Sequence, residues 1–528
     1  MSDSTGTTAA LLETVLGRAE DLAGAWGARA RASATSASER AILRLFGVGG
    51  LDRNGVPLAA SVVERHLGRV PDRLASGIAL PFAVALLEYD ASPQQMALDV
   101  ASGAVDLAFE AELLAEPVRR AAAAAEARRL AGVALERIDA NRTARLELLD
   151  VLGDAPWPWF GLSLSTPMLE KAAEHAADLV AAGANVVRVR VPAIRELVLR
   201  LHDRGLEPGY WHPREGQPVD GGEDPAAIPA GSQRALAVLR GRVDEAAAEI
   251  GRYVRLGMDA PALAAPEEAL VAALERIDIV EADPIDEIVG AGIDPDRALA
   301  DHAFGHRLLR RAGALVLIGP GPLIVAPDLE RGIPADPATR AGRAFAMQAL
   351  AVALARGDGL GAGQLAVGGL VPWLADERNP ATQALTSVAV RRLAWPDLVL
   401  AFDEPDLPGR SAARWPYLVG LALAVAGPGA IVLRRATGHD GALHAAETTR
   451  AAASVAADIA EDPAAVLARP AIAGHAEALL AAADATLGAL ADRGWEAILG
   501  APIGGSDLER LGADAVVERT EAFDPLLP

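Results

Sequence analysis

The sequence contains no cysteine, and this absence excludes several kinds of chemistry. Disulfide bonds, thiolate metal sites, iron–sulfur clusters and cysteine nucleophiles all require that residue. Basic residues are outnumbered by acidic ones, 49 against 71, and the formal net charge is −22. Because the basic residues do not cluster into a patch, we expect neither nucleic acid nor an anionic membrane surface as a partner.

Long apolar runs are also missing, although hydrophobic residues make up 51% of the chain and can fill a large core. Stretches rich in Ala and Leu, such as 418–426, are too short to span a bilayer. The first residues show neither the positive region nor the apolar region of a secretory signal. We therefore expect a soluble, cytoplasmic protein that does not enter a membrane.

Lysine is almost absent, since Lys171 is the only one in 528 residues. Enzymes that use pyridoxal phosphate normally hold this cofactor through a lysine. Lys171 follows Thr166-Pro167, a pair that signals the start of a helix, so we interpret it as a solvent-exposed helix residue. Covalent binding of pyridoxal phosphate would then need a lysine from another chain.

The hydrophobic pattern changes once along the chain, at Gly153-Asp154-Ala155-Pro156. Before this point, apolar residues recur at helical spacing. After it, short apolar runs alternate with amphipathic stretches, and eight of these runs are predicted strands, at 159–164, 185–191, 253–258, 277–280, 314–318, 364–367, 398–402 and 430–433. Strands that alternate with helices predict a parallel sheet.

Eight such units match a closed (β/α)₈ barrel, the TIM barrel, although an open doubly wound sheet would show the same alternation. Helical spacing returns near the C-terminus. We predict an α/β protein with a helical N-terminal region at 1–150, a TIM barrel at 151–460 and a helical C-terminal tail at 461–528.

Charged residues gather where the predicted strands end, which is where the catalytic groups of such barrels lie. Paired carboxylates and a histidine at one face could do acid–base work. The candidate catalytic residues are Asp259, Asp283, Asp403, Glu404, Arg434 and His439. Solvated loop charges or contacts with a partner protein are the competing interpretation.

Two further patterns are weaker. His302 and His306 lie four apart on a predicted helix, a spacing that permits two metal ligands on one face. No third ligand is evident, so no metal site is predicted. Gly319-Pro320-Gly321 follows a predicted strand and is interpreted as a turn, because no Gly-Lys-Ser/Thr follows it as in a phosphate-binding loop.

Several segments occur in the same order as in a known family. They include Glu39 to Val48, Gly50 to Leu58, Asn141 to Arg145, Gly251 to Leu256 and Leu274 to Asp278. In these segments the chain resembles the α subunit of lysine 5,6-aminomutase. The resemblance covers most of the chain and rests mainly on framework residues.

The resemblance implies a division of labour between two proteins. The α subunit of this family is a cofactor-binding barrel with helical additions, and a smaller β-like partner carries the adenosylcobalamin domain and the lysine for pyridoxal phosphate. The reaction moves a terminal amino group to the adjacent carbon by radical chemistry. This chain lacks the Asp-x-His-x-x-Gly cobalamin motif, as an α subunit would. A cobalamin-binding β-like subunit and at least a homodimer are therefore expected.

The resemblance fails where the family holds its phosphate. The stretch that corresponds to the family's phosphate-binding segment begins at Arg190, which could supply one guanidinium, but continues through Pro192, which has no N–H. Other cofactor contacts of the family fall at Pro261, Asp286, Ala291 and Pro322. Binding of pyridoxal phosphate is thus doubtful. A noncatalytic homologue that binds or regulates a cobalamin-dependent complex, or a barrel with other chemistry, remains the alternative.

Overall fold

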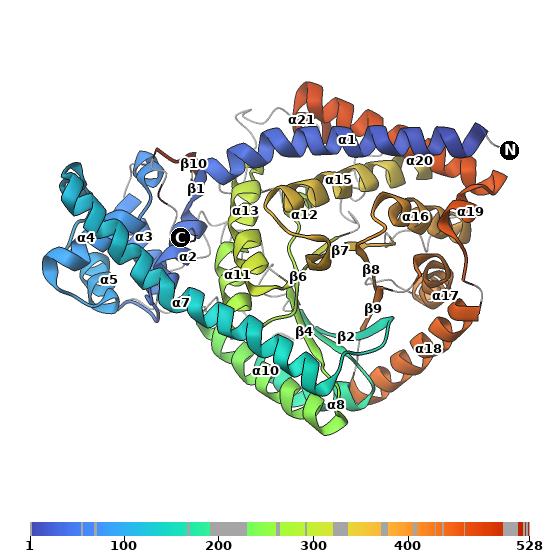
Figure 1. Cartoon of the computed structure of the whole chain (residues 1–528), viewed down its shortest axis with the longest axis horizontal. Coiled ribbons are helices and arrows are strands. Elements are labelled where there is room, and N and C mark those ends of the chain that lie inside the picture. The colour runs from blue at the N-terminus through green and yellow to red at the C-terminus, as the bar shows by residue number, and fades with distance from the viewer. Residues whose placement is uncertain are drawn as a thin grey trace.

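The computed structural model shows a ring of parallel strands inside a ring of helices, with a helical lobe at one side (Figure 1). It describes residues 3–53, 56–67, 71–165, 169–190, 230–259, 265–290, 293–319, 336–370, 379–404, 409–427, 429–435, 438–458, 460–499 and 516–520, together with 523 and 526. All structural statements below concern these residues.

Eight parallel strands close into a barrel. They are β2 (Trp159–Ser165), β3 (Val186–Arg190), β4 (Arg255–Asp259), β5 (Ile279–Glu281), β6 (Leu315–Ile318), β7 (Leu365–Gly368), β8 (Val399–Asp403) and β9 (Ala430–Arg435). Each strand pairs with the next, and β9 returns to β2 with Phe160 opposite Val432. All eight predicted strands are confirmed, with each end within two residues of its predicted position, and the open-sheet alternative is wrong.

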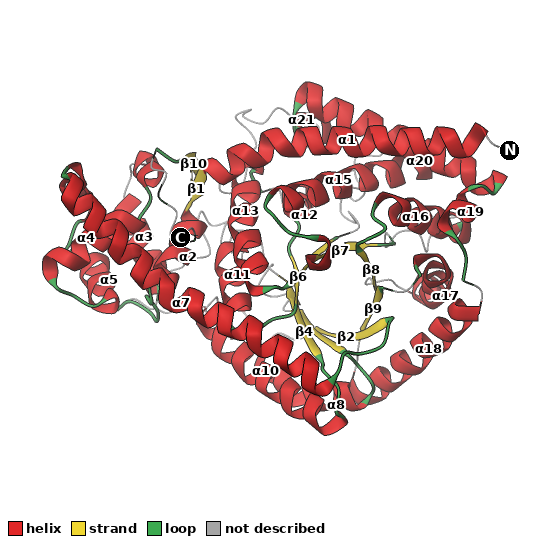
Figure 2. Ribbon diagram, in the orientation of Figure 1, coloured by secondary structure: helices red, strands yellow, loops and turns green. Residues whose placement is uncertain are grey.

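Helices surround the barrel, as Figure 2 shows by the red ring outside the yellow strands. They are α8 (Leu169–Ala181), α10 (Ala230–Ile250), α11 (Ala265–Leu274), α12 (Pro284–Gly290), α13 (Pro295–Ala312), α15 (Pro337–Gly357), α16 (Pro380–Ala394), α17 (Gly409–Ala426) and α18 (Gly438–Asp458). Asp294 and Asp336 start α13 and α15 by accepting backbone N–H groups, and a proline at the first position follows each.

The inside of the barrel is apolar near the amino ends of the strands. Side chains alternate between the two faces of a strand, so every second residue points inward. The inward cluster consists of Ala155, Trp159, Val186, Ile279, Leu315, Leu317, Ala366, Ala401, Ile431 and Leu433. Trp157 stacks on Trp159 with ring centroids 3.9 Å apart, and the Arg255 guanidinium lies 3.4 Å from the Trp159 ring. This layer forms a floor beneath the opposite, carboxyl end of the barrel.

The helical lobe contains α2 (Ser36–Leu45), α3 (Leu58–Leu67), α4 (Ala79–Tyr89), α5 (Pro93–Ser102) and α6 (Leu107–Glu110). The long helix α7 (Pro117–Leu152) leads from this lobe along the barrel to the start of β2 (Figure 1). The lobe and the barrel share one continuous hydrophobic core, which joins residues such as Phe82 and Val316 in a single cluster.

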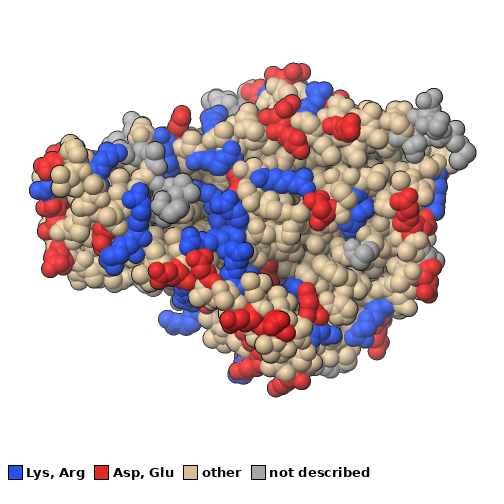
Figure 3. All heavy atoms as spheres, in the orientation of Figure 1, with Lys and Arg blue, Asp and Glu red and all other residues tan. Residues whose placement is uncertain are grey.

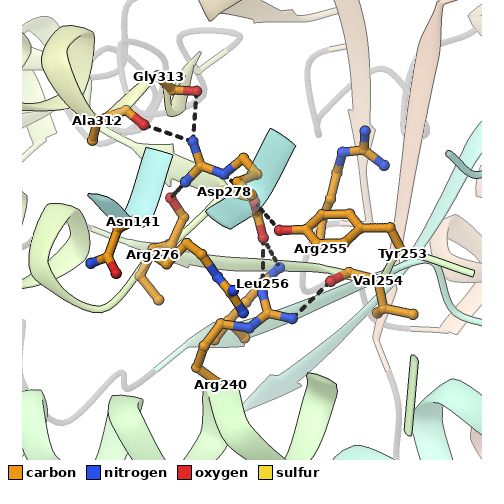
Figure 4. A network of polar contacts seen from close by, with 12 residues as sticks. Asn141, Arg240, Tyr253, Val254, Arg255, Leu256, Arg276, Asp278, Ala312 and Gly313 are labelled. Carbon is orange, nitrogen blue, oxygen red and sulfur yellow. Dashed lines mark hydrogen bonds and ion pairs between the residues drawn. The ribbon is translucent and has the colours of Figure 1, made fainter. Parts of the chain in front are cut away.

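A buried polar network ties α7 to the amino ends of the strands (Figure 4). At its centre, the Asp278 carboxylate accepts hydrogen bonds from the Tyr253 hydroxyl at 2.7 Å and the Leu256 N–H at 2.8 Å. It also forms ion pairs with Arg240 at 2.9 Å and with Arg145 of α7 at 2.7 Å. Because these partners come from α7, α10 and the approach to β4, a single carboxylate joins three parts of the fold.

The two ends of the chain meet. Helix α1 (Asp3–Ala32) crosses the outside of the barrel beside α15 and α20 (Pro470–Arg493), with α19 (Pro463–Leu467) and α21 (Glu496–Leu499) nearby. After α1, the short strand β1 (Ser33–Thr35) pairs antiparallel with β10 (Val516–Glu518). Only helices were predicted in both flanking regions, so this strand pair was missed because three residues give no readable alternation.

The surface corrects one premise drawn from the sequence. On the face shown in Figure 3, basic side chains gather in a band between the lobe and the barrel, although they form no run in the sequence. Arg311 is paired with Asp139 at 2.6 Å, and both side chains are partly exposed. Within the described residues, none of the helices combines the length and the apolar character that crossing a membrane requires.

Candidate functional site

A buried arginine lies at the carboxyl end of the barrel, above the apolar floor. Arg188 is in β3, two residues after the inward-facing Val186, so its side chain points into the barrel. Its Nε and Nη2 donate to Asp259 Oδ1 at 3.1 and 2.6 Å, and its Nη1 donates to Asp403 Oδ2 at 2.6 Å. Nη2 also forms an ion pair with Glu281. One guanidinium thus connects the ends of β4, β5 and β8.

The surroundings of this cluster explain its charge state. Arg188 is only 1% exposed, whereas the carboxylate side chains remain 25 to 37% exposed toward the mouth. Burial alone would lower the pKa of Arg188, but Asp259 and Asp403 outweigh this effect and raise the pKa above its usual value. Arg188 therefore stays charged. Its carboxylate partners are the groups that a ligand entering the mouth would meet first.

Ser163 adds an uncommitted hydroxyl to this layer. It lies opposite Arg188 in the parallel pairing of β2 with β3, and residues paired in register share a face of the sheet. Ser163 is 2% exposed, and its Oγ has no hydrogen-bond partner in the described structure. A buried hydroxyl without a partner is uncommon in folded proteins. Ser163 is thus a further candidate for contact with a ligand.

Asp283 occupies the rim beside this cluster. Its Oδ1 accepts the N–H groups of Ile285 at 2.9 Å and Asp286 at 3.4 Å, while its Oδ2 accepts the Gly319 N–H at 3.1 Å. Burial and the nearby Asp286 raise the pKa of Asp283 to about 7, even though these N–H groups favour the charged form. The carboxyl can therefore gain or lose a proton near neutral pH, as an acid–base group must.

Two helix side chains behind the rim fix the ends of β6 and β7. Gln348 Nε2 donates to the carbonyl oxygens of Gly319 at 2.8 Å and Gly368 at 3.0 Å. Arg391 Nε donates to Gln348 Oε1 at 2.8 Å and to Gly368 O at 3.0 Å. Gly319 is therefore held on both sides, by Asp283 through its N–H and by Gln348 through its carbonyl.

Of the other predicted residues, Glu404 and Arg434 lie apart from Arg188. Arg434 forms a two-pronged pair with Glu404, at 2.8 and 3.2 Å, and also reaches Thr448 of α18, so this pair faces the helices. His439 lies in the first turn of α18, and Arg190 is the last residue of β3; their side chains are outside the described part of the structure. Thus Asp259 and Asp403 meet at one point, Asp283 is beside them, and Glu404 with Arg434 is not part of this cluster.

Lys171 and the residues at the family's cofactor contacts are only partly covered by the described structure. Lys171 lies in α8, which confirms the predicted helix, although the position of its side chain is not described. Pro192, Pro261, Ala291 and Pro322 are outside the described residues, while Asp286 lies in α12 beside Asp283.

The histidine pair of α13 is committed to carboxylates. His302 Nε2 lies 3.0 Å from Glu287 Oε1, and His306 Nδ1 lies 2.9 Å from Asp358 Oδ2. Burial lowers the pKa of His302, but Glu287 outweighs this effect and the pKa is raised. The described residues contain no group of three or more acidic or histidine side chains placed to hold a metal ion.

Arg188, Glu281 and Ser163 are not among the candidate residues predicted from the sequence. A signal for Arg188 was present, because Val186, Arg188 and Arg190 alternate and share a face of their strand. The fourth strand was predicted to end at 280, which left Glu281 outside it. For Ser163 there was no signal, since a serine within a strand is ordinary.

Comparisons with known proteins agree with this architecture. Residues 10–369 match the family model described as the D-Lysine 5,6-aminomutase TIM-barrel domain of alpha subunit. The lysine 5,6-aminomutase alpha subunit of Fusobacterium nucleatum is 26% identical over 296 residues, which cover 54% of this chain and 51% of the relative. That of Acetoanaerobium sticklandii is 27% identical over 282 residues, 53% of this chain and 50% of the relative. The chain spans about half the length of the curated relatives it matches.

Proposed function

Because the chain belongs to the family of the D-lysine 5,6-aminomutase α-subunit barrel, we propose that it is the barrel component of an aminomutase assembly. The observation that carries this proposal is the family match, which runs from α1 through the lobe and as far as β7 of the barrel. The proposed reaction is a 1,2-shift of an amino group on lysine or a related amino acid. Both relatives are named for that activity.

The finer proposal is that a second protein completes the assembly. A cobalamin-binding β-like subunit would supply adenosylcobalamin and the lysine that holds pyridoxal phosphate. Two features support this division: the chain has no cobalamin motif, and its only lysine lies in α8, a helix of the outer ring. Self-association into at least a homodimer belongs to the same proposal.

Within such an assembly, the mouth would place substrate beside carboxylates. Asp259 and Asp403 would orient a cationic amino group, and Asp283 would accept or release a proton at its carboxyl oxygen. The roles of Glu404, Arg434 and His439 as further catalytic residues, and of Arg190 as a cofactor contact, remain proposals.

The test is to co-express the chain with a candidate cobalamin-binding partner and to purify the complex. We expect the two proteins to elute together and to convert lysine or a related diamino acid when both cofactors are added. Asp403→Asn should reduce the rate by at least about tenfold if that carboxylate orients the substrate. Asp139→Asn, which removes an exposed ion pair between α7 and Arg311, should leave the rate unchanged. A stable complex without turnover of any such amino acid would contradict the catalytic proposal.

A second candidate is a noncatalytic homologue that binds or regulates a cobalamin-dependent complex. The observation that favours it is the commitment of Arg188 to three carboxylates of the chain itself. This candidate predicts association with the partner and a change in the partner's activity, with no dependence on Asp403. The same co-purified complex therefore separates the two candidates.

A further inference from the structure

The mouth of this barrel contains groups that normally bind a phosphate. These are a guanidinium, a backbone N–H at the end of a strand and the first N–H groups of a helix. In the described structure they are represented by Arg188, Gly319 and the first turn of α12.

Arg188 is not available. Its Nε, Nη1 and Nη2 all point to carboxylates from three different strands. A phosphate that approached the guanidinium would have to displace at least one of these carboxylates, and it would then stand next to the others. Like charges a few ångströms apart repel strongly where water is partly excluded.

The backbone donors are occupied in the same way. Asp283 accepts the Gly319 N–H through one oxygen and the N–H groups of Ile285 and Asp286 through the other. Its carboxyl group therefore stands where a bound anion would otherwise satisfy these donors. Gly319 O is also taken, by Gln348, so the backbone at this strand end is held in place.

We infer that the described donors of this mouth are reserved for the chain's own carboxylates, so that the chain by itself does not hold the phosphate of pyridoxal phosphate. The inference rests on the family assignment and refines the proposed function. If the assembly uses this cofactor, the partner subunit holds it. The described part of the barrel mouth then contributes acidic groups toward the substrate and does not hold the phosphate of the cofactor.

The experiment uses the purified full-length chain without a partner. Pyridoxal phosphate and inorganic phosphate are titrated separately, by visible absorbance for the first and by calorimetry for both. The wild type should show no saturable binding up to millimolar concentrations. In the double variant Asp259→Asn/Asp403→Asn, which keeps the side-chain shape but releases Arg188 from two charges, phosphate should bind about tenfold more tightly or better.

Asp283→Asn provides a second test that leaves the Arg188 cluster intact and removes the negative charge beside the N–H groups of Gly319, Ile285 and Asp286. It should also raise the affinity for phosphate. Asp139→Asn, which removes an exposed carboxylate on α7, is the matched control and should change nothing. Circular dichroism and a thermal melt establish that each variant is folded.

Micromolar, saturable binding of pyridoxal phosphate by the wild type would overturn the inference, above all if Arg188→Gln weakened it. Folded variants that gain no affinity would overturn it as well, because the carboxylates would then not be the reason. These outcomes are independent of the proposed function. A chain that binds no phosphate can still form an active complex, and a chain that binds it can fail to find a partner.

Discussion

Two neighbouring glutamates in α11, Glu267 and Glu268, show how the local environment of a carboxyl group determines its pKa. Both are buried, and Glu267 Oε2 lies 2.8 Å from Arg40 Nε. Glu268 Oε1 has no hydrogen-bond partner in the described structure. Burial raises the pKa of Glu268 to about 7, because the nearby Arg44 offsets only part of the cost of desolvation.

The raised pKa of Glu268 predicts a pH-dependent stability. A carboxyl that binds its proton more tightly in the folded state favours folding while protonated, and its ionisation costs stability as the pH rises from about 4.5 to about 7. Relative to the wild type, Glu268→Gln should gain up to about 1.4 kcal/mol per pH unit across that interval. Urea unfolding at pH 5, 6, 7 and 8 measures this difference.

Glu267→Gln is the control for the Glu268 variant. It breaks the buried pair with Arg40 and should cost about 3 kcal/mol or more at every one of these pH values. If the difference between Glu268→Gln and the wild type did not change with pH, the assigned pKa would be wrong.

At the scale of elements, the contact between α15 and α20 on the outside of the barrel depends on a glycine. Gly342 of α15 faces α20, and a Cβ atom added there would lie 2.4 Å from Leu479 O and 2.6 Å from Ala482 Cβ. Backbone cannot move aside as a flexible side chain can. The absence of a side chain at Gly342 therefore sets the distance at which α20 packs on α15.

We expect Gly342→Ala to destabilise the protein by about 1–3 kcal/mol, as overpacking of a buried contact does. Gly241→Ala is the matched control, since Gly241 lies in α10 with no atom within 4 Å of an added Cβ. There the alanine should stabilise by about 0.5–1 kcal/mol through its higher helix propensity. Urea unfolding of both variants checks the prediction, and equal effects at the two positions would contradict it.

At the scale of the whole molecule, lobe and barrel form one unit. Their hydrophobic core is continuous, and Asp278 joins the strands to α7 through Arg145. Burial raises the pKa of Asp278, but the two arginines beside it outweigh this effect and lower the pKa below its usual value. The stability that this carboxylate contributes is therefore present above about pH 4 and is lost as the pH falls through its lowered pKa.

Asp278→Asn should lower the stability of the entire chain by about 3–5 kcal/mol at neutral pH, because it removes the carboxylate that pairs with buried Arg145 and one of the two that pair with buried Arg240. Differential scanning calorimetry should show one transition in the wild type, shifted as a whole in the variant. Asp139→Asn, which removes the exposed ion pair of Asp139 in the same helix α7 with Arg311, should change stability by less than about 1 kcal/mol. A wild type that melts in two separate steps would show that lobe and barrel are independent.

The order of the elements was predictable from the sequence by itself. Strands such as Leu315–Ile318 and helices such as Pro295–Ala312 are specified by local periodicity and by capping residues, which are readable within a short window. The same holds for the single lysine and its helix, and for the family resemblance, which the family match then confirmed.

Only the tertiary structure decided which charges meet. Arg188 and Asp403 are 215 positions apart, and nothing local in either segment indicates that the ring closes so that their side chains lie 2.6 Å apart. In the same way, Glu404 and Asp403 are adjacent in sequence, yet one faces the helices and the other the mouth, because side chains alternate along a strand. Local sequence sets which elements form, while the long-range closure of the barrel sets which of their charged groups share a site.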